Sequence, residues 1–104
     1  MEMDMNAMMQ QAQLMQMELA RAQAEIQEMT YTATSGGGMV KVTAVGDGSI
    51  SDISINPEAV DPDDVEMLQD MVLVAVNEAL RGVAEAGENR MSEVTGGISI
   101  PGLF

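Results

Sequence analysis

The chain contains no cysteine and no histidine, and these two absences exclude several kinds of chemistry. Without thiols there is neither a disulfide framework nor a cysteine nucleophile. Without imidazole there are no Ser-His or Cys-His pairs, and the usual zinc sites lose their ligands. Paired carboxylates could still catalyse hydrolysis, but they would need a pocket and nothing in the sequence suggests one. We therefore expect a protein that is not an enzyme and that carries no metal and no other cofactor.

Basic and aromatic residues are scarce. Only four of the 104 residues are basic while 17 are acidic, so the net charge is −13, and a homodimer would carry twice that, −26. Such a charge repels polyanions at long range and, taken alone, argues against a nucleic-acid partner. The chain has one Tyr, one Phe and no Trp, but it has twelve Met residues. The core must therefore consist of Met and aliphatic side chains, of which Met packs adaptably.

Long apolar runs are missing as well. The longest, residues 71–76, is far shorter than the roughly 20 residues that cross a bilayer. The first residues include Glu2 and Asp4 in place of the basic segment of a signal peptide. We therefore expect a single domain spanning residues 1–104 in the cytoplasm, with no membrane contact and no small-molecule substrate.

The first third of the chain has a heptad pattern. Its apolar residues alternate in steps of three and four, as at the a and d positions of a coiled coil: Met5, Met8, Ala12, Met15, Leu19, Ala22, Ile26 and Met29. A helix over residues 4–29 would be about 39 Å long, whereas the rest of the chain should have a radius of gyration of only about 11 Å. We expect this helix to project and to pack its seam against another helix or a second copy, chiefly through Met5, Met8, Met15, Leu19 and Ile26. The alternative is an amphipathic helix folded back on its own sheet.

Residues 30–55 predict a three-stranded antiparallel meander. β-prone segments at 30–34, 39–45 and 50–55 are separated by short glycine-containing turns. Apolar and polar residues alternate along the second and third segments, so one face of the sheet should be covered. Ile50 breaks this alternation, which indicates either a bulge or a strand that starts at Ser51.

A second helix is expected over residues 62–93. Asp61 is a candidate N-cap and Pro62 suits the first helical position. Apolar residues on more than one side suggest that the middle of this helix is buried on two sides, while Gly82 and Gly87 indicate a kink or an early end. The uncharged segment 94–104 is expected to form a flexible tail, whose apolar residues would contact a partner: Ile98, Ile100, Leu103 and Phe104. The predicted fold is thus α+β, an α-β-β-β-α protomer with two long helices.

Two motifs suggest ligand binding at first inspection. The run Gly36–Gly38 lacks the Lys-Ser/Thr pair of a phosphate-binding loop, so a hairpin loop is favoured. The acidic residues of segment 61–70 lack the spacing of a calcium-binding EF-hand loop, so helix capping and a solvated face are favoured.

The whole sequence resembles the YbaB/EbfC family of nucleoid-associated proteins. The matching segments are MNAMMQQAQLMQMELARAQAEI, SGGGMVKVTAVGDGSISDISINPE and DPDDVEMLQDMVLVAVNEAL, followed by a glycine-rich tail. The resemblance implies an α-β-β-β-α protomer that forms a homodimer through the sheet and neighbouring helices, with projecting N-terminal helices. It also implies DNA binding, bending or compaction of DNA, an influence on expression, and a place in the cytoplasm at the nucleoid.

The charge of this chain departs from that of the family it resembles, whose members usually carry several Lys residues in the first helix. Here residues 1–30 hold one base and five acids, and residues 61–93 hold two bases and nine acids. Because phosphate neutralisation by Lys and Arg supplies most non-specific affinity, we expect weak and salt-sensitive DNA binding. Arg21 is the first candidate for a phosphate contact, followed by Arg81 and Arg90, while Lys41 would serve the sheet surface.

Two functions are compatible with these observations. The first is a dimeric, nucleoid-associated protein that grips the DNA backbone and affects DNA shape and expression. The alternative is an acidic homodimeric protein-interaction module of the same fold that has lost DNA binding. A salt series separates them, because only phosphate contacts predict a steep loss of affinity with salt.

Overall fold

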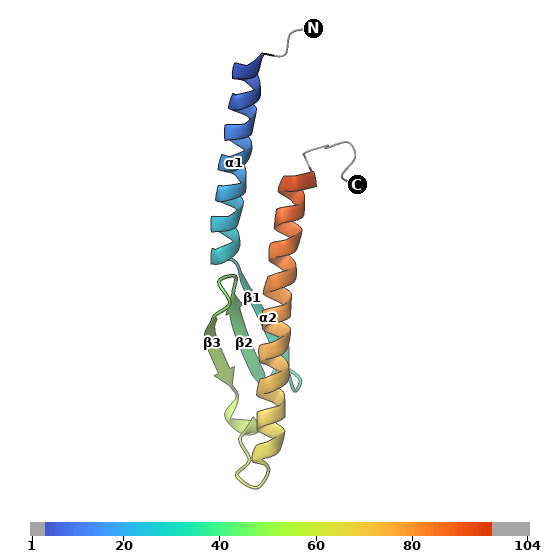
Figure 1. The fold of residues 1–104 in the computed structure, drawn as a ribbon. Coiled ribbons are helices and arrows are strands. Elements are labelled where there is room, and N and C mark those ends of the chain that lie inside the picture. Colours follow the sequence, from blue (N-terminus) through green and yellow to red (C-terminus); the bar gives the residue numbers. More distant parts are fainter. Residues whose placement is uncertain (1–3, 97–104) are drawn as a thin grey trace.

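A computed structural model describes residues 4–96 and contains two long helices and a three-stranded antiparallel sheet (Figure 1). The order along the chain is α1, β1, β2, β3, a short 3-10 helix η1 (Pro57–Ala59) and α2. This order confirms the α+β fold predicted from the sequence.

Helix α1 spans Met5–Glu28, within the predicted range. Asp4 is its N-cap, where a carboxylate oxygen accepts a hydrogen bond from the Asn6 backbone N–H at 3.0 Å. The helix ends at Met29, whose backbone is extended and leads directly into the Thr-rich first strand. No Pro or Gly interrupts it, so the helix is continuous over 24 residues.

The sheet is formed by β1 (Thr30–Ser35), β2 (Val40–Val45) and β3 (Ile50–Ile55), in the order β1-β2-β3. The β1–β2 turn uses Gly36–Gly38, all with positive φ, so this run is a hairpin loop. In β3, Asp52 pairs with Thr43 whereas Ile50 pairs with Ala44. One residue, Ser51, is therefore left without a partner, and the structure selects the bulge from the two alternatives for this strand.

Helix α2 spans Val65–Gly96, so the predicted start at Pro62 is wrong. Asp61 closes a separate turn by accepting from the Asp63 N–H at 2.9 Å. The helix is capped instead by Asp64, whose carboxylate accepts from the Met67 N–H at 3.2 Å. Several acidic residues in a row could each act as a cap, and the one next to the apolar stripe does so.

The C-terminal end of α2 also differs from the prediction. The helix continues through Gly82 and Gly87 to Gly96, so the predicted end at residue 93 and the irregular structure expected from residue 94 onward are wrong up to Gly96. Both internal glycines allow close packing: a Cβ at Gly82 would collide with the Tyr31 ring, and one at Gly87 would lie 2.9 Å from the Ile26 Cγ2. The expected partner contacts of the tail fall on residues 97–104, outside the described residues.

The core lies between α2 and the first two strands. Seven buried residues form it, all small or medium in size: Ala33, Val40, Val42, Ala44, Ala75, Ala79 and Val83. Among residues 4–96, the largest fully buried side chains are Val40 and Val42. Small residues let the helix approach the sheet closely, but they bury little apolar surface, so this protomer has a thin core.

Only part of α1 is covered. Ala22 is fully buried and Leu19 and Ile26 are partly buried beside α2, whereas every residue from 4 to 14 is exposed. Figure 1 shows α1 extending past the end of α2. The chain consequently measures 77 × 24 × 15 Å. The alternative of a helix folded back on its own sheet is therefore wrong, since α1 packs on α2 and then projects.

Candidate nucleic-acid interface

Arg21 and Arg90 lie together although they are far apart in sequence. They line one hollow of about 320 Å³ between α1 and α2, together with Glu18, Glu93 and Val94. The close contact of the two helices below this point, around Ala22 and Gly87, holds the two arginines at the same level. Two of the three predicted DNA-contact residues are thus neighbours.

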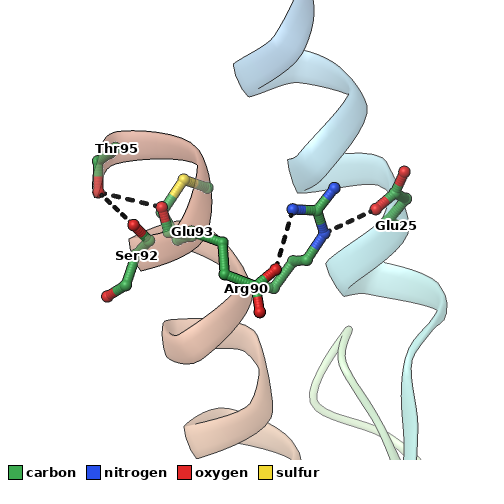
Figure 2. Close-up of polar contacts among 6 residues, drawn as sticks. Glu25, Arg90, Ser92, Glu93 and Thr95 are labelled. Carbon is green, nitrogen blue, oxygen red and sulfur yellow. Dashed lines mark hydrogen bonds and ion pairs between the residues drawn. The ribbon is translucent and has the colours of Figure 1, made fainter. Parts of the chain in front are cut away.

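The Arg90 guanidinium is engaged in this hollow. Its Nε donates to the Glu25 carboxylate on α1 at 2.9 Å, and its Nη1 donates to Glu93 at 3.4 Å (Figure 2). Both ion pairs are solvent-exposed, and such pairs contribute only about 0–1 kcal/mol each. Within residues 4–96, Arg21 forms no ion pair. Arg21 is therefore the cation of this hollow with its charge available to a ligand.

Arg81 is separated from this pair of arginines. It lies on the side of α2 that faces β1, in a polar hollow of about 400 Å³ that also contains Glu78, Glu85 and the Tyr31 side chain. Two carboxylates surround a single guanidinium here, so the local charge is negative. The structure does not bring Arg81 to the other predicted contacts.

Lys41 occupies a third location. It is exposed on β2, where its register partners are Thr34 on β1 and Ser54 on β3. The side chains of Thr32 and Thr43 are hydrogen-bonded at 2.8 Å on the sheet. Val40 and Val42 point towards α2, so Lys41 belongs to the opposite, uncovered face. The four basic residues therefore occupy three places and make no continuous basic surface.

The projecting end of α1 is instead neutral. Residues 5–17 contain no charged residue, although Asp4 precedes and Glu18 follows them. Asn6, Gln10 and Gln13 recur at helical spacing and share one face of the exposed helix. The exposed Met17 follows them on this face, and Arg21 lies one turn beyond Met17. Amide groups donate hydrogen bonds to phosphate oxygens without adding charge. This amide stripe, with Arg21 beyond Met17, is the arrangement most suited to a DNA backbone.

A second surface is apolar and was not among the predicted site residues. The apolar side chains of β3 and of the adjacent side of α2 form a surface here called the β3–α2 face: Ile53, Ile55, Leu68, Val72, Leu73 and Val76. All of these except Ile53 line, together with Gln69, an open groove of about 440 Å³. In the single chain Leu73 is 58% exposed and Ile53 48% exposed. The expected burial of α2 on two sides is therefore wrong for the protomer alone, because α2 covers β1 and β2 but leaves β3 bare.

The described chain offers little for other kinds of site. Neither helix within residues 4–96 is long and apolar enough to cross a membrane. In the same residues, no group of three acidic side chains gathers in a way that would hold a metal ion.

Comparison with known proteins gives a consistent family. The family model described as the YbaB/EbfC DNA-binding family matches residues 1–98. A nucleoid-associated protein of Caldanaerobacter subterraneus is 52% identical over 101 residues, which cover 97% of this chain and 91% of that protein. One of Acetivibrio thermocellus is 52% identical over 102 residues, covering 97% of this chain and 90% of that protein.

A solved structure shares the fold. The crystal structure of an uncharacterized protein from Helicobacter pylori matches with a TM-score of 0.67 and 26% sequence identity. The match covers 88% of this chain and 97% of that one.

Proposed function

The chain belongs to the YbaB/EbfC DNA-binding family, and from this membership we propose that it is a homodimeric nucleoid-associated protein that grips the DNA backbone through its α1 helices. The membership identifies a nucleoid-associated DNA-binding protein from a family that is not one of enzymes. The protein would then be located in the cytoplasm, at the nucleoid. Bending or compaction of DNA and effects on expression are part of the proposal.

The observation that carries the proposal is the projecting, charge-free end of α1. A strongly acidic protein repels DNA over a distance of roughly a Debye length, about 10 Å at 0.1 M salt. Along residues 5–17 no carboxylate opposes the approach of a phosphate. The amides of Asn6, Gln10 and Gln13 then bind backbone oxygens, and Arg21 neutralises a phosphate. These contacts read no bases, so binding is independent of sequence.

A homodimer is supported by the β3–α2 face. Its lining has no charged side chain, which makes it one of few surfaces where two copies of net charge −13 can meet without repulsion. A two-fold axis along β3 would place the α2 stripe of each copy over the bare β3 of the other. The dimer would also enlarge the thin core of the protomer.

The test is fluorescence anisotropy of a labelled 30-bp duplex of ~100 Å, titrated with protein at about 50 mM and about 200 mM salt. Even a few phosphate contacts predict a loss of affinity of about tenfold or more between these two salt concentrations. Arg21→Glu should weaken binding at the lower salt by about tenfold or more. Lys41→Glu is the matched control, because it reverses the same charge on the sheet face away from α1 and should change affinity far less.

The competing function is an acidic interaction module that has lost DNA binding. Its specific support is the engagement of Arg90 by two glutamates, which removes one of the few cations from the surface. Absence of binding at about 50 mM salt would favour this module. Equal losses from the Arg21 and Lys41 variants would show instead that DNA is bound elsewhere than along α1.

A further inference from the structure

The projecting end of α1 carries an uncovered packing surface. Residues 5–14, here called the arm tip, extend past α2, and all of them are exposed (Figure 1). Within the arm tip Met5 is 74% exposed and Met8 49% exposed. Further along the same seam α2 covers the equivalent positions, so that Ala22 is fully buried. The seam thus continues for about three turns beyond its intramolecular partner.

The charge of the arm tip decides which partner suits it. A chain of net charge −13 repels its own copies wherever acidic side chains face each other. The arm tip has no charged residue, and its seam positions Met5, Met8 and Ala12 are those that pack against like positions in a coiled coil. Methionine side chains also adapt to one another in a shared interface. A second arm tip therefore satisfies both the heptad pattern and the electrostatics.

We propose that the arm tip pairs with the arm tip of a second copy of this chain, as a short coiled coil built on Met5, Met8 and Ala12. The contact is separate from the β3–α2 face, so it is an additional way for copies to associate. It uses the side of α1 opposite to Gln10, which leaves the amide stripe free. An interface this short is weak and depends on protein concentration.

The natural absence of cysteine allows a direct proximity test. Met8→Cys places a thiol on the proposed seam, and Gln10→Cys places one on the opposite side of the same exposed turn. Each full-length variant, without DNA, is treated with a short bismaleimide at increasing protein concentration. We expect covalent dimers to form about tenfold faster through position 8, because cross-linking requires side chains on facing surfaces.

Each outcome of the cross-linking either supports or overturns arm-tip pairing. Faster reaction through position 10 would place the contact on the side of Leu14 and Met17 and would overturn it. Equal rates, or no cross-linking through either position, would also overturn it, as expected if residues 97–104 or another partner covered the seam. Since no DNA is present, failure here leaves the proposed DNA binding untouched.

A second measurement separates pairing from chance collisions. In sedimentation velocity at high protein concentration, the wild-type protein should show a species larger than the homodimer proposed above. Met8→Glu adds a charge to the seam and should remove this species, whereas Gln10→Glu adds the same charge to the opposite side and should leave it. Both residues are exposed, so neither substitution disturbs the core. Equal behaviour of the two variants contradicts arm-tip pairing.

Discussion

At the scale of single residues, Asp47 shows how a turn residue acquires an altered acidity. It lies between β2 and β3, where its carboxylate accepts hydrogen bonds from the Ser49 hydroxyl and from the Ser49 backbone N–H, the latter at 2.9 Å. The Ser49 hydroxyl is the larger cause, and together the two bonds hold the pKa of Asp47 below its ordinary value. Hydrogen bonds to the charged form therefore favour the closed turn.

The sign of the resulting pH dependence follows from the lowered pKa. The contribution of Asp47 to stability is fully present above the pKa of the unfolded chain and is lost as the pH falls through the folded-state pKa. An NMR titration of the Asp47 carboxyl carbon should give a midpoint below that of an ordinary aspartate. Ser49→Ala removes the hydroxyl donor and should raise the midpoint towards the ordinary value. An unchanged midpoint in that variant would contradict this assignment of the cause.

At the scale of elements, the junction between α1 and the sheet depends on one close approach. The Gly46 N–H donates to the Met29 carbonyl at 2.8 Å, which ties the β2–β3 turn to the end of α1. A Cβ at Gly46 would collide with the Ile26 carbonyl oxygen, which is backbone and cannot rotate away. This contact sets where the projecting helix leaves the body of the protein.

Gly46→Ala should therefore destabilise the protein by about 1–3 kcal/mol, as overpacking usually does. Gly96→Ala is the matched control, because a Cβ there meets nothing within 4 Å and the position is the last of α2. Chemical denaturation followed by circular dichroism measures both. Equal stabilities of the two variants would show that the turn moves away from α1 at little cost.

At the scale of the whole molecule, the sheet is only half covered. α2 lies over β1 and β2, so the apolar side of β3 and the adjacent side of α2 remain open. The long first helix adds a second open surface at the other end of a chain 77 Å long. Two separate uncovered apolar surfaces on one elongated chain explain why an isolated protomer makes so little core.

A test of the dimer belongs to this scale. Leu73→Glu adds a carboxylate to the β3–α2 face and should convert the proposed homodimer to a monomer in sedimentation or light scattering. Val74→Glu is the matched control, since Val74 is 47% exposed but lies outside this groove. Retained helical circular dichroism would show that both variants fold. If both variants remain dimeric, or both dissociate alike, the interface lies elsewhere.

Much of the local structure was predictable from the sequence by itself. The heptad spacing predicted the full length of α1, and alternating residues between glycine-containing turns predicted the three strands. Both predictions succeed because the spacing of apolar residues depends on which side of an element is covered. The position of Arg21 on the long first helix also follows from the spacing of the apolar residues. Boundaries were less secure: among several adjacent aspartates, only packing decided that Asp64, and not Asp61, caps α2.

The tertiary structure decided how these elements use their surfaces. The Arg90–Glu25 ion pair joins residues 65 positions apart, so no local pattern could separate an engaged arginine from a free one. Likewise, Gly82 and Gly87 resemble helix breakers in sequence, but they make room for Tyr31 and Ile26 in the folded chain. The bare β3 follows from where α2 crosses the sheet. Residue patterns determine which side of each element is apolar, whereas only packing determines which of those sides finds a partner within the chain.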